Sequence, residues 1–213
     1  RVPRYEPAVG MTRLETVRAS RAEADQRRGR AGRLEPGVCY RLWSQSQHEQ
    51  LAAYGAPEIL QADLAGLALQ LARWGVTPEQ LTWLDVPPAA SYAQAQQLLE
   101  RLGALGGLKL TPHGEAMAQL PAHPRIAHLL LRGHDLGLAA MACDVAALLG
   151  ERDILRGAGA DVHSRLALLS GENRAARGGQ GGVQRARQLA RQYQGYLRGK
   201  PAQPVADPDH SRW

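Results

Sequence analysis

Apolar residues three to four positions apart dominate the sequence from Ser44 onwards, a spacing typical of helices that pack one face on a core. The clearest stripe consists of Leu60, Leu64, Leu67, Leu71 and Trp74. Gly75 follows this stripe directly, as expected at the end of a helix. Further helical patterns cover residues 47–54, 92–102, 115–119, 124–136, 138–149, 163–169 and 183–197. We therefore predict a mainly α fold with small β elements.

The strand signals are few and short. Residues 2–5 and 11–17 flank a Pro-Ala-Val-Gly turn, which indicates a hairpin. Residues 37–43, Gly-Val-Cys-Tyr-Arg-Leu-Trp, are rich in types that favour strands. A second, tight hairpin is expected over residues 105–110, after which Thr111 begins a further helical unit.

Charge favours an anionic partner. The 213 residues, enough for one large or two small domains, carry a net charge of +6 and a pI of about 9.8. Of the 26 basic residues only Lys109 and Lys200 are lysines, which leaves 26 − 2 = 24 arginines. Phosphate recognition and coding bias both account for such a preference. Nucleic acid is the partner that this balance predicts.

Cysteine and histidine spacing predicts neither a metal site nor a disulfide. Cys39 and Cys143 lie far apart and form no CxxC pattern, which fits a reducing cytoplasm. His123, His128 and His134 do not share one helix face, so we interpret them as surface or core residues. The N-terminus has no apolar signal region, and residues 136–150 are too short to span a bilayer. A soluble, cytoplasmic chain without a membrane partner is expected.

The stretch from Ser20 to Arg33, SRAEADQRRGRAGR, has the strongest pattern for chemistry. Ser20 with Glu23 forms a capping box, so a helix should run over residues 21–28. Gln26 and Arg30 lie one helical turn apart, and Arg33 follows three residues later, so one surface can carry all three side chains.

These residue types suit a phosphoryl group. Two guanidinium forks beside an amide can clamp phosphate oxygens, and Gly29 and Gly32 remove the Cβ atoms that would hinder a close approach of the ligand. A solvated basic turn, or a non-specific nucleic-acid patch, explains the spacing equally well.

Residues 26–33, Gln-Arg-Arg-Gly-Arg-Ala-Gly-Arg, with Glu-Pro-Gly-Val-Cys-Tyr-Arg-Leu at 35–42, resemble the last helicase motif of the DEAH-box branch of superfamily-two helicases. These residues most resemble those of the HrpB-type ATP-dependent helicases. Shorter sequence motifs resemble parts of the family's winged-helix domain (residues 56–60 and 83–88) and of its helical bundle (residues 110–114, 120–125 and 151–153). The resemblance extends to about Arg198.

The resemblance implies a domain order. Residues 1–45 would be the end of the second RecA-like α/β domain, with its hairpin, last motif and a strand. Residues 46–110 would be a winged helix, 111–199 a helicase-associated helical bundle, and 200–213 a flexible tail. In the family, the opening hairpin projects towards nucleic acid, which makes Arg13 a candidate contact; an ordinary sheet edge is the alternative.

The resemblance also implies roles for individual residues. Arg30 and Arg33 would be arginine fingers, and Gln26 would position the attacking water or a γ-phosphate oxygen, with Gly29 part of the nucleotide site. Single-stranded RNA, bound through its phosphates and without sequence preference, is the implied partner. Arg185 and Arg187 are candidate RNA contacts, although the pattern favours packing of their helix on the bundle over direct RNA binding.

The ATP-binding elements are missing from the sequence. It contains neither a G-x-x-x-x-G-K-[ST] loop nor a DEAH-like tetrad. We therefore expect ATP and Mg²⁺ to be bound mainly by RecA-like domains that would precede Arg1, and expect this chain alone to bind neither and to be inactive. The alternatives are a stand-alone winged-helix nucleic-acid-binding or adaptor module, and a structural interaction bundle. Neither needs the Gln-x-x-x-Arg-x-x-Arg pattern, and the bundle would also leave the basic charge unexplained.

Overall fold

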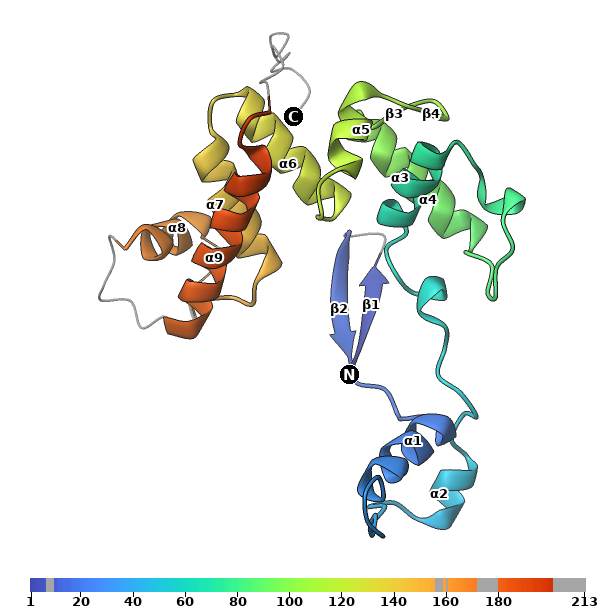
Figure 1. Cartoon of the computed structure of the whole chain (residues 1–213). Coiled ribbons are helices and arrows are strands. Elements are labelled where there is room, and N and C mark those ends of the chain that lie inside the picture. The colour runs from blue at the N-terminus through green and yellow to red at the C-terminus, as the bar shows by residue number, and fades with distance from the viewer. Residues whose placement is uncertain (7–9, 156–158, 160, 172–179, 201–213) are drawn as a thin grey trace. The chain divides into compact units, whose positions relative to one another are not determined.

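The computed structural model describes residues 1–6, 10–155, 159, 161–171 and 180–200, and confirms a mainly α fold with small β elements (Figure 1). The chain divides into two compact units. The first comprises residues 1–71 and 76–97, and the second residues 72–75 with the chain from 98 onwards. Two helices, α3 (Ala65–Trp74) and α4 (Ala89–Arg101), therefore contribute residues to both units.

The first unit opens with the predicted hairpin. Strands β1 (Val2–Glu6) and β2 (Met11–Glu15) pair antiparallel, which places Arg4 opposite Arg13. Two diagonal ion pairs offset this like-charge contact, Arg4 to Glu15 at 3.0 Å and Arg13 to Glu6 at 2.9 Å. The predicted hairpin is thus confirmed, while its turn, residues 7–9, lies outside the described residues.

Helix α1 (Arg21–Ala31) begins at the predicted capping box. The Ser20 backbone N–H donates to Glu23 Oε2 at 2.7 Å, and Ser20 Oγ accepts from the Glu23 N–H at 3.2 Å. The prediction that the helix ends at Arg28 is wrong: α1 continues through Gly29 to Ala31, and Gly32 is its C-cap. A single glycine costs a helix only about 1 kcal/mol.

The strand predicted over residues 37–43 is absent from the described structure. A strand needs a partner, and the described residues place no other strand beside this segment. Val38, Tyr40 and Leu42, which would lie on the same face of a strand, are 75%, 84% and 95% exposed. The segment leads into α2 (Gln45–Glu49), which is shorter than the predicted helix over residues 47–54.

Helix α3 has a shorter apolar face than its sequence stripe predicted. The Asp63 carboxylate accepts from the Ala65 N–H at 2.9 Å, so the helix begins after Leu60, which lies in a separate short 3-10 helix, η1 (Glu58–Leu60). Leu64 and Leu71 are buried, whereas Leu60 and Trp74 at the two ends of the stripe are exposed. A second 3-10 helix, η2 (Pro78–Gln80), precedes α4.

In the second unit, the end of α4 is followed by the predicted tight hairpin, β3 (Leu105–Gly106) and β4 (Lys109–Leu110), and then by α5 (Pro112–Ala118). Thr111 joins them: its hydroxyl donates to the Gly103 carbonyl at 2.6 Å and accepts from the Gly114 N–H at 3.0 Å. A Cβ on Gly114 would lie 2.1 Å from the Ala104 carbonyl oxygen, so this contact requires glycine.

Helices α6 (Pro124–Asp135), α7 (Ala139–Gly150), α8 (Val162–Ser170) and α9 (Gln180–Leu197) form the bundle (Figure 1). Alanines on α7 allow close packing on α6 and α9, and a Cβ on Gly133 would lie 2.3 Å from that of Ala142. The apolar stripe of α9 is confirmed, with Ala186, Ala190 and Tyr193 buried. The tail beyond Lys200 lies outside the described residues.

Candidate nucleotide-clamp site

The predicted clamp residues lie at the C-terminal end of α1. Gln26, Gly29 and Arg30 are on the helix, and Arg33 follows its C-cap. All four are exposed, and within the described part of the chain no hydrogen bond or ion pair holds the side chains of Gln26, Arg30 or Arg33. The end of a helix carries partial negative charge, so an anion here would be held by the guanidinium groups rather than by the helix dipole.

The glycines in and after the motif differ in their surroundings. A Cβ on Gly29 would meet nothing within 4 Å, and one on Gly32 would approach neighbouring backbone no closer than 3.8 Å. A Cβ on Gly37 would lie 1.8 Å from the Ala31 carbonyl oxygen. Gly37 is therefore the glycine that lets the chain fold back against the end of α1, a role that sequence reasoning did not assign.

Arg41 makes a second contact between this loop and the helices. Its Nη2 lies 2.5 Å from Asp25 Oδ1 on α1, and its Nη1 donates to the His48 ring on α2, 3.0 Å from Nε2. The hydrogen bond from Arg41 is the main cause that lowers the pKa of Asp25, aided by the charge of Arg28. Asp25 and Arg41 are sixteen positions apart, so sequence spacing gave no signal for their contact.

The three predicted RNA contacts already have protein partners. Arg13 pairs with Glu6 on the hairpin, and Arg185 on α9 pairs with Glu151 at 3.2 Å. Arg187 donates from Nε to the Leu169 carbonyl at 2.7 Å, which satisfies an acceptor in the last turn of α8. Arg13 and Arg185 remain well exposed, with side chains 68% and 59% accessible.

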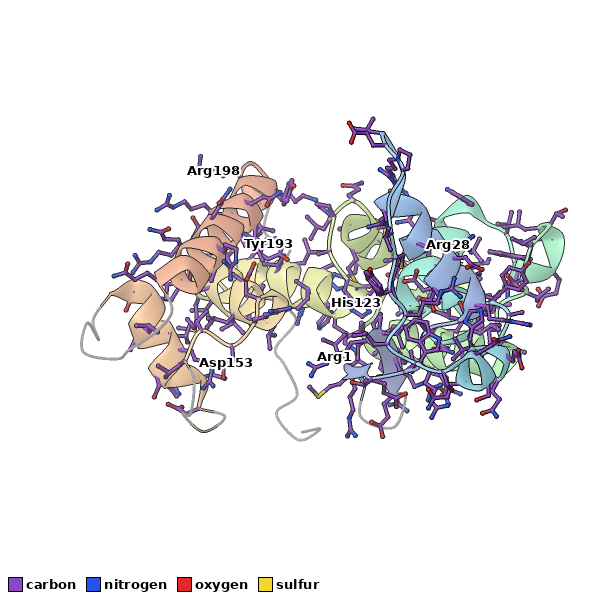
Figure 2. The ribbon with its side chains drawn as sticks, turned by 90° about the horizontal axis from the view of Figure 1, so that it is seen from below. Arg1, Arg28, His123, Asp153, Tyr193 and Arg198 are labelled. Carbon is purple, nitrogen blue, oxygen red and sulfur yellow. The ribbon has the colours of Figure 1, made fainter. Side chains whose placement is uncertain are left out.

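Two residues of the Glu151-Arg152-Asp153 motif, Glu151 and Asp153, also form ion pairs. Asp153, labelled in Figure 2, binds Arg165 in bidentate fashion at 2.9 and 2.6 Å, and this contact is the main cause that lowers the pKa of Asp153. Arg165 Nη1 also donates to the carbonyls of Gly159 and Asp161. Figure 2 labels Tyr193 on α9 and Arg198 just beyond the end of that helix; Tyr193 is buried and Arg198 is exposed.

Two histidines form a pair that the sequence did not predict. His113 Nε2 on α5 lies 3.0 Å from His128 Nδ1 on α6, and the rings meet edge to face at 5.1 Å. Burial is the main cause that lowers the pKa of both residues, and the charge of Arg132 adds to it. In the described part of the chain, no three His, Cys, Asp or Glu side chains are grouped so that they could hold a metal ion. The same residues include no helix long and apolar enough to cross a membrane.

Comparison with known proteins identifies the family. The chain is 47% identical over 152 residues to the ATP-dependent RNA helicase HrpB of Escherichia coli, a match covering 71% of this chain and 19% of that protein. It is 40% identical over 147 residues to the probable ATP-dependent RNA helicase DHX34 of Mus musculus, covering 68% and 13%. A crystal structure of the Escherichia coli DEAH/RHA helicase HrpB matches with a TM-score of 0.75 and 38% identity, covering 97% of this chain and 24% of that one.

This chain belongs to the HrpB-type DEAH-box helicase family. It corresponds to the family's C-terminal helicase region and spans about a fifth of the length of the HrpB protein that it matches. A second crystal structure, of the Escherichia coli DExH-box NTPase HrpB, gives a TM-score of 0.68 and 40% identity over 91% of this chain. No family model matches the chain.

Proposed function

We propose that this chain acts as the C-terminal part of an ATP-dependent RNA helicase and supplies Arg30 and Arg33 as arginine fingers, with Gln26 beside them. The observation that supports this is the state of the side chains around α1. Arg41 and Arg28 lie beside the Asp25 carboxylate, whereas Gln26, Arg30 and Arg33 are exposed and have no partner among the described residues. They are therefore available to a ligand.

Their chemistry fits phosphoryl transfer. Charge spreads over the oxygens of the transferred γ-phosphoryl group, and two guanidinium forks can stabilise it more strongly in the transition state than in the ground state. Gln26, one turn before Arg30, can hold the attacking water or a γ-phosphate oxygen, and Gly29 leaves open space beside them. Arginine fingers contribute about 10³ to 10⁵ in rate.

ATP and Mg²⁺ would be bound mainly by RecA-like residues that this chain does not contain. The exposed arginines fit the phosphate groups, but the chain has no P-loop, and its described residues offer no cluster of metal ligands. Mg²⁺ would neutralise phosphate charge in that other part of the helicase. We assign residues 1–45 to the end of the second RecA-like domain, 46–110 to a winged helix and 111–199 to the helical bundle.

RNA would be bound as a single strand, through its phosphates and without sequence preference. Arg13 and Arg185 support this, because exposed ion pairs contribute only about 0–1 kcal/mol and a phosphate can replace their carboxylate partners. Arg187 is a weaker candidate, since its guanidinium already satisfies the Leu169 carbonyl.

The test uses the helicase that contains this chain together with its ATP-binding domains. Arg30→Ala and Arg33→Ala should each lower kcat for RNA-stimulated ATP hydrolysis at least about 100-fold, with RNA affinity nearly unchanged, because both act on charge that develops at the γ-phosphate. Arg30→Lys should also be severe, since an ammonium cannot form the bidentate fork.

Arg27→Ala is the matched control, because Arg27 is exposed on the same helix but lies outside the clamp. It should leave kcat within about twofold, as expected for a surface charge. Equal, small losses of RNA affinity in all of these variants, with turnover retained, would support a basic nucleic-acid surface and contradict the finger assignment.

A further inference from the structure

We propose that Arg41 is a positioning residue for the clamp, holding residues 32–41, here called the finger loop, against α1 and α2. The loop carries Arg33, while Gln26 and Arg30 are on α1. The geometry of the clamp thus depends on how firmly the loop is fixed to that helix. This inference rests on the proposed function of Gln26, Arg30 and Arg33.

The first support is the position of the Arg41 contacts. Its guanidinium reaches Asp25, the residue immediately before Gln26, and also the His48 ring on α2. The Arg41 side chain is 25% exposed, less than the 49% of Asp25, so Arg41 is partly buried where it makes these contacts. The contact between Arg41, at one end of the finger loop, and Asp25 on α1 should fix the position of Arg33 relative to Gln26 and Arg30.

The second support is the close approach at the middle of the loop. Gly37 packs so tightly on the Ala31 carbonyl that a side chain there would overlap it. Ala31 is the last residue of α1, one position after Arg30. Together, Gly37 and Arg41 hold the loop to the helix at two separate points beyond Arg33.

The third support is that apolar burial contributes little to holding the loop. Leu34, Val38 and Tyr40 are 98%, 75% and 84% exposed, and Leu42 just beyond them is 95% exposed. Arg41, between Tyr40 and Leu42, is the side chain that turns inward to a polar contact. Removing it should leave the segment after Gly37 without a side-chain hydrogen bond or ion pair to α1 among the described residues.

A loosened loop would act on turnover rather than on binding. Transition-state stabilisation by fixed donors depends on their position, and a misplacement of about 1 Å can cost about 100-fold in rate. ATP and RNA bind through many other contacts in such enzymes, so their affinities should change little.

The first experiment reads the loop directly in this chain, without any activity. Cys39 lies on the loop and is exposed, whereas Cys143 is buried, so a thiol-reactive spin label should attach at Cys39. Arg41→Ala should increase the mobility of the label, and Arg41→Lys should restore part of the order because a lysine can still pair with Asp25. Asp25→Asn should shift mobility in the same direction as Arg41→Ala, by a smaller amount.

Arg28→Ala is the matched control, because Arg28 also approaches Asp25, at 3.9 Å, but does not belong to the loop. Its label mobility should equal that of the unchanged chain. Unchanged mobility in Arg41→Ala, or an equal increase in Arg28→Ala, would overturn the proposal. If Arg41→Ala lowers the melting temperature of the whole chain, Arg41→Lys and Asp25→Asn carry the test.

The second experiment measures kinetics in the complete helicase. Arg41→Ala should lower kcat at least about tenfold while KM for ATP and Kd for RNA stay within about twofold, and Arg41→Lys should recover part of the rate. Loss of turnover in Arg33→Ala but full turnover in Arg41→Ala would overturn the positioning role alone. Full turnover in Arg33→Ala would overturn the finger assignment, whatever the spin label shows.

Discussion

Glycines at the end of α1 show how the same residue type has different roles within nine positions. Gly29 faces open space in the last turns of the helix, whereas Gly37 touches the backbone of Ala31. The sequence pattern predicts a role in ligand approach for Gly29 and Gly32 and none for Gly37. Only the tertiary structure shows that the fold requires a glycine at position 37.

At this scale, alanine substitutions of Gly29 and Gly37 should have opposite effects on the free energy of unfolding of the chain. Gly37→Ala should destabilise it by about 1–3 kcal/mol, because the new Cβ overlaps the Ala31 carbonyl and the backbone must shift. Gly29→Ala should stabilise it by up to about 1 kcal/mol, because alanine favours a helix and has space here. Urea denaturation measures both.

The same pair separates folding from function in the complete helicase. If a phosphate approaches the backbone at Gly29, Gly29→Ala should lower ATP turnover although it stabilises the fold. Retained turnover in Gly29→Ala would remove Gly29 from the nucleotide site and leave the roles of Arg30 and Arg33 open to their own test.

At the scale of elements, a histidine pair joins α5 to α6. His113 on α5 and His128 on α6 share a hydrogen bond in which one ring nitrogen donates and the other accepts, so the pair cannot form when both rings are protonated. Arg132 on α6 lowers both pKa values further, while Asp135 acts in the opposite direction on His113.

We expect the melting temperature of the chain to fall as the pH is lowered from about 7.5 through the ordinary histidine range near 6.5. The sign follows from linkage: with folded pKa values below the unfolded ones, the unfolded state binds more protons, so stability is complete above the unfolded pKa and is lost as protons bind. Thermal unfolding at a series of pH values measures this.

His128→Gln should flatten that pH dependence, because glutamine can still hydrogen bond but does not titrate. His163→Gln is the control, since His163 is exposed on α8 and lies outside this pair. An equally steep pH dependence in His128→Gln would show that other groups cause the loss of stability.

At the scale of the whole chain, the sequence has a net charge of +6 but contains no P-loop motif. We expect the purified chain to bind single-stranded RNA weakly, with affinity falling as salt rises, and to show no ATP turnover. Fluorescence anisotropy at two salt concentrations and a phosphate-release assay measure this. Salt-independent binding would contradict the phosphate-contact model, and turnover that survives rigorous purification would contradict the assignment of ATP binding to other domains.

Local pattern determined much of this protein from sequence alone. The capping box at Ser20, the hairpins around residues 7–10 and 105–110, and the apolar stripe of α9 depend on neighbours a few positions apart, and each was predicted. The spacing of arginine and glycine after Gln26, together with the motif over residues 35–42, likewise indicated the helicase family that the comparisons show.

Tertiary structure decided what depends on residues far apart in the chain. The segment over residues 37–43 has the composition of a strand, but it pairs with no strand among the described residues and so forms none, because strands are held by hydrogen bonds to other strands and not by their own sequence. The contact of Arg41 with Asp25, the pairing of His113 with His128 and the closeness of Gly37 to Ala31 likewise join separate segments. No periodicity encodes such contacts, because they arise only once helices and loops pack together.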